Sequence, residues 1–99
     1  MHVISRQQLI AFYKQPGRGD AKGPLEAWYY EAKHAQWDSP ADIKESYRSV
    51  SIIGDNRVIF NFAGNKYRLI VRINYTSKTV FVRFIGTHKE YNKINVEEI

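Results

Sequence analysis

The chain has 99 residues, of which 43% are hydrophobic and 14% aromatic, which predicts one globular domain over residues 1–99 and excludes a disordered chain. It has no cysteine, which excludes disulfide bonds, thiolate metal sites and thiol nucleophiles. No stretch approaches the roughly 20 apolar residues of a membrane span, and no signal-peptide pattern is found, so we expect a cytoplasmic protein with no membrane partner. The net charge of +5 favours a polyanionic partner.

Helices are predicted over the first half of the chain. Residues 2–4 are expected to form a short strand, and Ser5 can cap a helix that begins at Arg6 and ends at the Gln-Pro-Gly sequence of residues 15–17. A second helix should begin near Asp20 or Pro24. Its apolar stripe is typical of a core-facing helix and consists of Leu25, Trp28, Tyr29, Ala32 and Ala35 or Gln36. Asp38 or Ser39 is expected to cap a third, short helix.

From Arg57 the period of the apolar residues changes from 3.6 to 2, which predicts β-strands. A first strand alternates up to Phe62, and residues 63–65 are typical of a hairpin turn. Further strands are expected over residues 66–75 and 79–85. This order predicts an α+β fold, in which a short N-terminal strand and helices pack on one face of a small antiparallel sheet.

Basic residues dominate the region between Asp55 and Glu90, which contains no acid. The seven basic residues of this region are Arg57, Lys66, Arg68, Arg72, Lys78, Arg83 and Lys89. Ordinary surfaces mix charges of both signs, so this pattern favours a nucleic-acid partner. The alternatives are an acidic protein partner and a sheet face that its cations merely keep soluble.

Alternation places many of these cations on one face of the sheet. Those expected there, over roughly 20 Å of strand, are Lys66, Arg68, Arg72, Arg83 and, across the first hairpin, Arg57. On the last strand, Phe81 and Ile85 are expected to share this face. If helices cover the other face, the row can bind successive phosphates while aromatic rings stack on unpaired bases.

Residues 58–94 carry three motifs: FNFAGNKYRLIV, an aromatic-rich strand ending in RFIGTH, and EYxKI after it. In this combination the chain closely resembles the HigB family of bacterial type II toxins, within the RelE-like superfamily. The resemblance covers more than a third of the chain, and the N-terminal half agrees in layout only. The family commonly has EYD where this chain has Glu90, Tyr91 and Asn92. If that aspartate acts in the chemistry, Asn92 weakens the enzyme; if it only caps a turn, Asn92 serves as well.

The resemblance implies an endoribonuclease that cleaves messenger RNA, typically on the ribosome, and that is silenced by a HigA-type antitoxin. It implies chemistry without a metal or other cofactor. A base takes the proton of a ribose 2′-OH, the oxygen attacks the adjacent phosphorus, cations stabilise the phosphorane, and an acid protonates the leaving 5′-oxygen. The carboxylates are scattered and no histidine pair has ligand spacing, so no metal site is expected.

His88 is the candidate general acid or base, because imidazole exchanges protons near neutral pH; the alternative is a structural histidine. Arg68 is the strongest candidate for contact with the phosphate or the transition state, and Arg83 follows. Tyr91 can donate a proton, stack on a base or pack against the last turn. Glu90 either orients His88 or is a solvated acid. The candidate RNA-binding residues are Arg57, Lys66, Arg72 and Lys89, the last of which stands where relatives often carry a small residue.

Two functions from different classes therefore fit the sequence. The first is a toxin ribonuclease. The second is a non-catalytic module that binds RNA or the ribosome through the same basic sheet face. Only the enzyme would leave cuts in messenger RNA, so cleavage separates the two.

Overall fold

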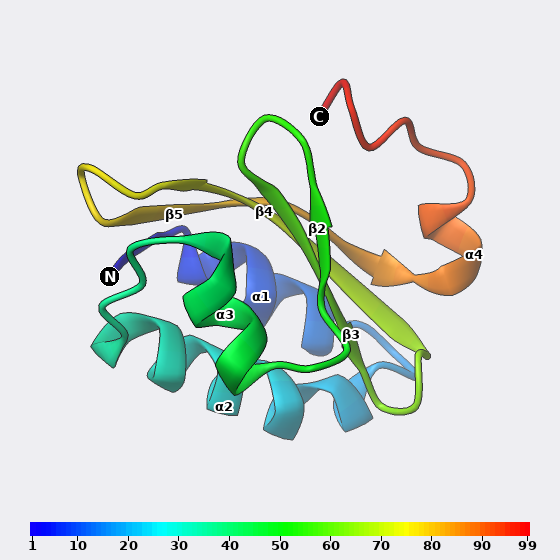
Figure 1. Ribbon diagram of the computed structural model, residues 1–99. Helices are drawn as coiled ribbons and strands as arrows, with labels where there is room; N and C mark the ends of the chain where they lie inside the picture. The colour runs from blue at the N-terminus through cyan, green and yellow to red at the C-terminus, as the bar shows by residue number, and fades with distance from the viewer.

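The computed structural model describes residues 1–99 as a five-stranded sheet with three helices on one face (Figure 1). The strands are β1 (His2–Ile4), β2 (Ser51–Ile53), β3 (Arg57–Phe62), β4 (Tyr67–Asn74) and β5 (Thr79–Thr87). The helices are α1 (Arg6–Tyr13), α2 (Lys22–His34), α3 (Pro40–Ser46) and α4 (His88–Tyr91), and a 3₁₀ turn, η1 (Gly19–Ala21), precedes α2. The predicted α+β fold is confirmed. No helix combines the length and apolar character that crossing a membrane would require.

The sheet has the strand order β1-β5-β4-β3-β2. Strand β1 runs parallel to β5, and the other neighbours are antiparallel. In the register between β3 and β4, Arg57 lies opposite Arg72 and Asn61 lies opposite Arg68. The hairpin of β3 and β4 therefore sets the polar residues of the two strands side by side, as the alternation indicated.

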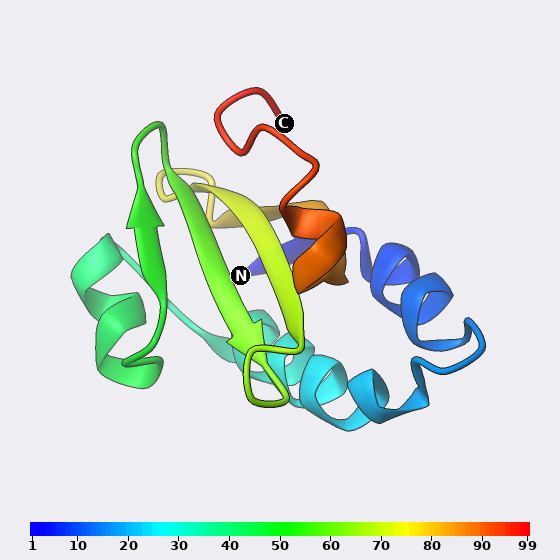
Figure 2. The ribbon, with the colours of Figure 1, turned by 90° about the vertical axis from the view of Figure 1, so that its right-hand side faces the viewer.

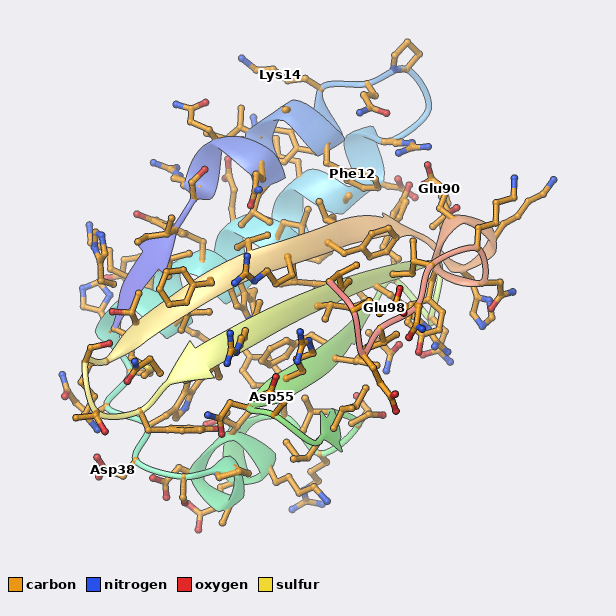
Figure 3. All side chains as sticks on the ribbon, turned by 90° about the horizontal axis from the view of Figure 1, so that it is seen from above. Phe12, Lys14, Asp38, Asp55, Glu90 and Glu98 are labelled. Atoms are coloured by element: carbon orange, nitrogen blue, oxygen red, sulfur yellow. The ribbon has the colours of Figure 1, made fainter.

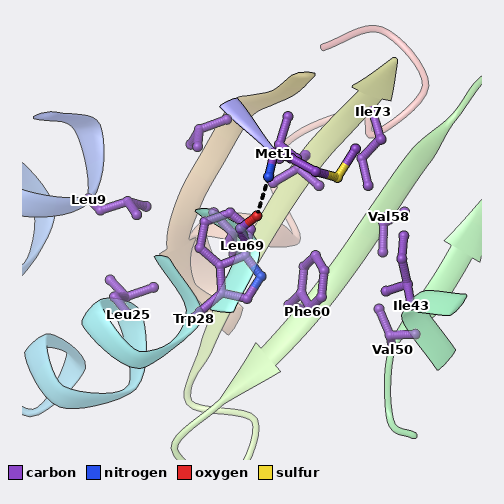
Figure 4. Packing of buried hydrophobic residues seen from close by; sticks show 14 of the residues in the cluster. Met1, Leu9, Leu25, Trp28, Ile43, Val50, Val58, Phe60, Leu69 and Ile73 are labelled. Atoms are coloured by element: carbon purple, nitrogen blue, oxygen red, sulfur yellow. Dashed lines mark hydrogen bonds between the residues drawn. The ribbon is translucent and has the colours of Figure 1, made fainter. Parts of the chain in front are cut away.

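The hydrophobic core lies between the sheet and helices α1, α2 and α3 (Figure 4). From α2, Leu25, Trp28 and Ala32 are buried, which confirms that the apolar stripe faces the core. The Trp28 ring meets the Phe60 ring of β3 edge-on, with centroids 5.5 Å apart. Tyr67, Leu69, Val71 and Ile73 of β4 also point to this side. Alternation therefore leaves Arg68 and Arg72 on the opposite, open face, together with the apolar Ile70.

Strand β2 has no counterpart among the predicted elements. Its three residues are too few to display alternation, and β2 pairs antiparallel with β3 through a turn at residues 54–56. Asp55 and Asn56 both have a φ of 61°, in the left-handed region that Asp and Asn tolerate better than most residues. The turn residues Gly54, Asp55 and Asn56, which follow the apolar pair Ile52-Ile53 and precede Arg57 and the pair Val58-Ile59, were the available signal for this hairpin.

Strand β5 departs from simple alternation at Arg83. The pairing with β4 shifts between residues 70 and 71, which leaves Arg83 as one extra residue on β5. Such a β-bulge moves every later side chain to the other face. Ile85 therefore packs against the core, and Phe84 takes its expected place opposite Ile70. The prediction that Ile85 shares the open face with Arg83 is wrong for this reason.

After β5 the chain forms the short helix α4, two residues beyond the predicted strand end, and then passes over the open face. In Figures 1 and 2 this C-terminal segment, residues 92–99, lies on the side of the sheet away from α1, α2 and α3. Figure 3 looks onto the open face, with Asp55 and Glu98 over the sheet and Glu90 at the α4 end. The open face thus carries both the basic residues and part of the C-terminal segment.

Candidate active site

A capping box fixes the junction between β5 and α4. The backbone N–H of Thr87 donates to Glu90 Oε1 at 2.9 Å, and the backbone N–H of Glu90 donates to Thr87 Oγ1 at 3.2 Å. These reciprocal bonds satisfy donors that a helix start otherwise leaves free. The box makes His88 the first residue of α4. Glu90 also pairs with Arg18 at 3.1 Å, so it supports the junction and does not orient the His88 ring.

Three of the four predicted catalytic residues meet at this junction. A terminal nitrogen of the Arg68 guanidinium lies 3.2 Å from His88 Nε2. The same guanidinium lies over the Tyr91 ring, 4.4 Å from its centroid. The His88 and Tyr91 rings are edge to face with centroids 6.3 Å apart. Arg68 forms no ion pair, so no carboxylate of the protein neutralises its charge.

The contacts of His88 indicate which ring nitrogen carries the proton. A guanidinium can only donate hydrogen bonds, so Nε2 accepts from Arg68 and a neutral ring must then be protonated at Nδ1. The side-chain amide of Asn92 lies at Nδ1, with its nitrogen 3.3 Å away. Rotating this amide by half a turn exchanges the positions of its nitrogen and oxygen without changing its shape. The oxygen can then accept a hydrogen bond from Nδ1–H. Asn92 therefore lies where it can hold the ring in the tautomer whose Nε2 is unprotonated, and in the absence of RNA this nitrogen accepts from Arg68.

Three of the predicted RNA-binding cations are paired with acids. Lys66 Nζ lies 2.7 Å from Asp20, whose other oxygen accepts from the Tyr67 hydroxyl at 2.5 Å. Asp55 lies between Arg57 at 2.7 Å and Arg72 at 3.3 Å. The acids that balance this face thus come from its edge and from η1, far away in the sequence. These pairs reduce the net charge that Lys66 and Arg72 can offer to a phosphate.

Arg57 is further enclosed by the C-terminal segment. Only 7% of the residue is exposed. Its Nε and Nη2 groups donate to the carbonyl oxygen of Ile99 at 2.9 and 2.5 Å. With its guanidinium engaged by Asp55 and Ile99, Arg57 holds the segment on the sheet. A contact between Arg57 and RNA stays a prediction.

Arg83 lies apart from the junction. Thr87 follows it by four positions, roughly 13 Å along β5. It lines a cavity of about 380 Å³ together with Arg72 and Phe81, at the other end of the open face. Lys89 is exposed on α4 next to His88 and forms no ion pair. The structure thus divides the basic residues between two places on one face.

The largest cavity, of about 670 Å³, lies elsewhere, between α2 and α3. Its lining includes Glu31, Asp42 and Glu45 and no lysine or arginine. A polyanion would be repelled there. RNA binding is therefore better served by the sheet face, although that face has the smaller cavity.

The sequence matches known proteins of one family. Residues 21–94 match the model of the HigB toxins, RelE-like toxic components of toxin–antitoxin systems. The chain belongs to the HigB toxin family. It is also 26% identical over 99 residues to an mRNA interferase HigB of Escherichia coli O6:H1 (strain CFT073), an alignment that covers 95% of this chain and 91% of the relative. The resemblance seen in the sequence is thus confirmed, and the family match reaches well beyond residues 58–94.

The part that matches the HigB family includes every residue of the junction. It begins within η1 and ends just after Asn92, so it contains Arg68, His88 and Tyr91 and excludes β1 and α1.

Some residues that shape the site were not predicted to do so. Arg18 and Asp20 lie before α2, Arg18 just ahead of η1 and Asp20 within it. Each is more than 40 residues from the residue that it supports, and no local pattern indicates such pairs. Asn92 had a signal, because a relative's aspartate at this place suggested a role beside the active residues. His88 begins α4 and Asn92 caps its C-terminal end, and this i, i+4 spacing lets their side chains meet.

Acid should destabilise this HigB-family protein through three carboxylates. The backbone N–H of Thr87, and then Arg18, hold the pKa of Glu90 below its ordinary value of 4.5. The hydrogen bond from Lys66 lowers the pKa of Asp20, and the one from Arg57 lowers that of Asp55, both from 3.8. A lowered folded-state pKa gives stability that is present above the unfolded pKa and is lost as pH falls through the folded value.

We therefore expect the free energy of unfolding, measured with urea, to fall progressively as the pH drops below about 4.5. Glu90→Gln should flatten the upper part of this pH dependence, because it removes one of the three titrating groups. Glu45→Gln is the matched control, since Glu45 is an exposed acid of α3 without an ion pair. Identical pH profiles for Glu90→Gln and the parent would contradict the assigned role of Glu90.

Proposed function

We propose that this protein is an endoribonuclease that cleaves messenger RNA, with its active site at the junction of β5 and α4. The observation that carries the proposal is the contact between an arginine without a carboxylate partner and the Nε2 atom of a histidine, 3.2 Å apart. A fixed cation beside a group that moves protons is what RNA cleavage by the ribose 2′-OH requires. The name of the E. coli relative, mRNA interferase HigB, supports the same activity.

In this mechanism His88 Nε2 takes the proton of the 2′-OH. The oxygen then attacks the adjacent phosphorus, and Arg68 donates to the phosphorane oxygens as negative charge develops. Arg68 contacts Nε2 in the absence of RNA, so the incoming 2′-OH and phosphate must share the guanidinium and the imidazole between them. Catalytic hydrogen bonds commonly reach their final geometry only when substrate is bound.

Tyr91 has two parts to play in this proposal. Its ring supports the Arg68 guanidinium, which stacks over it at 4.4 Å. Its hydroxyl makes no hydrogen bond within the protein and can donate to the leaving 5′-oxygen. Tyr91→Phe separates the two, because the phenylalanine keeps the ring and lacks the hydroxyl. A lower cleavage rate for this variant assigns the hydroxyl to proton transfer, whereas an unchanged rate leaves only the packing role.

The partners follow from the family and from the charge. A toxic component of a toxin–antitoxin system is opposed by an antitoxin, and we propose one of HigA type. We further propose that the messenger RNA is cut on the translating ribosome. Lys89, exposed beside His88, and the cations of the open face would contact the RNA backbone there.

Translating ribosomes incubated with the purified protein should yield messages with new 5′ ends, and cleavage should persist in EDTA when the ribosomes are pre-assembled. Expression of the chain alone should stop bacterial growth, and a co-expressed HigA-type antitoxin should restore it. Bound but uncut messages would identify a non-catalytic RNA- or ribosome-binding module instead. Unimpaired growth during strong expression of folded protein would count against the toxin proposal.

A further inference from the structure

We propose that the cavity around Arg72, Phe81 and Arg83 binds one nucleotide of the RNA, away from the bond that is cut. This inference rests on the proposed ribonuclease function and assigns a second, separate subsite to the same open face. The cavity measures about 380 Å³, within the usual range for a small-ligand site.

Its lining has the three kinds of group that hold a nucleotide. Arg72 and Arg83 can bind a phosphate, and Phe81 can stack on a base. The Arg83 guanidinium lies 5.7 Å from the centroid of the Phe81 ring, so charge and aromatic surface face the same space. Asn56 and Asn74 add side-chain amides, which can donate to and accept from base edges.

A bulge in β5 borders this arrangement. Arg83 is the extra residue of the bulge and therefore has no partner opposite it on β4. Without the bulge, the alternation would place Ile85 on the same face as Arg83, and the residues after Arg83 would pair with β4 in a register shifted by one residue. Bulges often re-aim a side chain beside a functional site. Arg83 is exposed and forms no ion pair, so its donors are available to a ligand.

The position of the cavity indicates a neighbouring nucleotide and not the one that reacts. Arg72 follows Arg68 by four residues on β4, roughly 13 Å along the strand. An RNA that places a phosphate at Arg68 must therefore extend along the sheet to reach the cavity. No acid lines the cavity, and Asp55, which lies 3.3 Å from Arg72, forms no ion pair with Arg83.

The test is a double-substitution cycle between the protein and the RNA. In a set of synthetic messages, each message carries a single abasic ribonucleotide, at a different position on either side of the cut. Each message is supplied either on pre-assembled ribosome complexes or as free RNA, according to which of the two the parent cuts. We expect one position, separated from the cut, at which base removal slows the parent by about tenfold to a hundredfold, the scale of one lost base stack. At that position the abasic message should be cut by Phe81→Leu no more slowly than the intact one.

Arg83→Gln extends the test, since an exposed side chain can be replaced without disturbing the core. It should raise the message concentration needed for half-maximal cleavage and leave the rate at saturation within a few-fold. Tyr30→Leu, on the exposed face of α2, is the matched control for Phe81→Leu. Arg48→Gln, in the loop after α3, is the matched control for Arg83→Gln. Both controls should behave as the parent.

The outcomes are distinct. If abasic substitutions slow the parent, Phe81→Leu and Arg83→Gln by equal factors at every position, the cavity holds no nucleotide and the inference is overturned while the ribonuclease stands. If the parent cuts no RNA under any condition, the proposed function fails, and the subsite fails with it. A coupled effect at one position supports the inference.

Discussion

Replacing Arg68 with alanine should lower messenger RNA cleavage by about 10²–10³-fold, the loss seen when one donor to a transition-state oxyanion is removed. The effect should be large because Arg68 is the only guanidinium at the β5–α4 junction that lacks a carboxylate partner. Developing charge on the phosphorane would then face only the His88 and Tyr91 rings. The measurement is the rate at which new 5′ ends appear in a programmed translation mixture.

Two further variants show whether the loss comes from charge at this place. Arg68→Lys keeps the charge but not the fork of donors, so it should recover part of the rate. Arg48→Ala removes an exposed arginine from the loop after α3 and should cleave as the parent does. If Arg68→Ala has the same melting temperature as the parent and cleaves at the same rate, Arg68 does not stabilise the transition state.

His88→Gln should lower cleavage by about 10²–10⁴-fold, the range for loss of a general acid or base. Glutamine can still form a hydrogen bond with Arg68 but cannot take a proton from the 2′-OH. The variant should therefore bind RNA or the ribosome within a few-fold of the parent while the rate of cutting falls. Measuring association and cleavage on the same complexes separates these effects.

His34→Gln is the matched control for this change. His34 is exposed at the end of α2, where its ring contacts the Tyr30 ring in a tilted arrangement on the helical side of the molecule. It should leave cleavage unchanged. If His88→Gln cuts like the parent at every pH tested, the histidine is structural, and proton transfer passes to Tyr91 or to the lysines.

Alternation along β4 was enough to predict which of its residues face the core and which face outward. The period of 2 is a local property of the chain, and Tyr67, Leu69 and Val71 are buried against the helices as it indicates. The same argument failed after Arg83, because one extra residue reverses the face of all that follow. A bulge depends on how a strand pairs with its partner, and the sequence of β5 alone does not indicate it.

The charge of the open face was harder to predict than its position. The run without acids between Asp55 and Glu90 suggested that all its cations are free. In the folded chain Asp20 reaches Lys66 from the loop before α2, and Asp55 lies between Arg57 and Arg72. These pairs depend on tertiary contacts. Among the seven basic residues of this run, the three without a carboxylate partner are Arg68, Arg83 and Lys89.

The contact between Arg68 and His88 could be anticipated only in part. The sequence placed His88 just after the last strand and Arg68 on the neighbouring one, which brings both to the same end of the sheet. The capping box of Thr87 and Glu90 then turns the chain so that the imidazole meets the guanidinium. Glu90 thus acts on the site through the backbone of α4.

The most direct test of this account is the chemistry of the RNA ends produced on translating ribosomes. Attack by the 2′-OH breaks the bond to the 5′-oxygen, so the upstream fragment must end in a 2′,3′-cyclic phosphate and the downstream fragment must begin with a 5′-hydroxyl. We expect these ends with the parent, and their loss in a variant that combines Arg68→Ala with His88→Gln. Downstream fragments that begin with a 5′-phosphate, or parent-like cutting by the double variant, would contradict the proposed site.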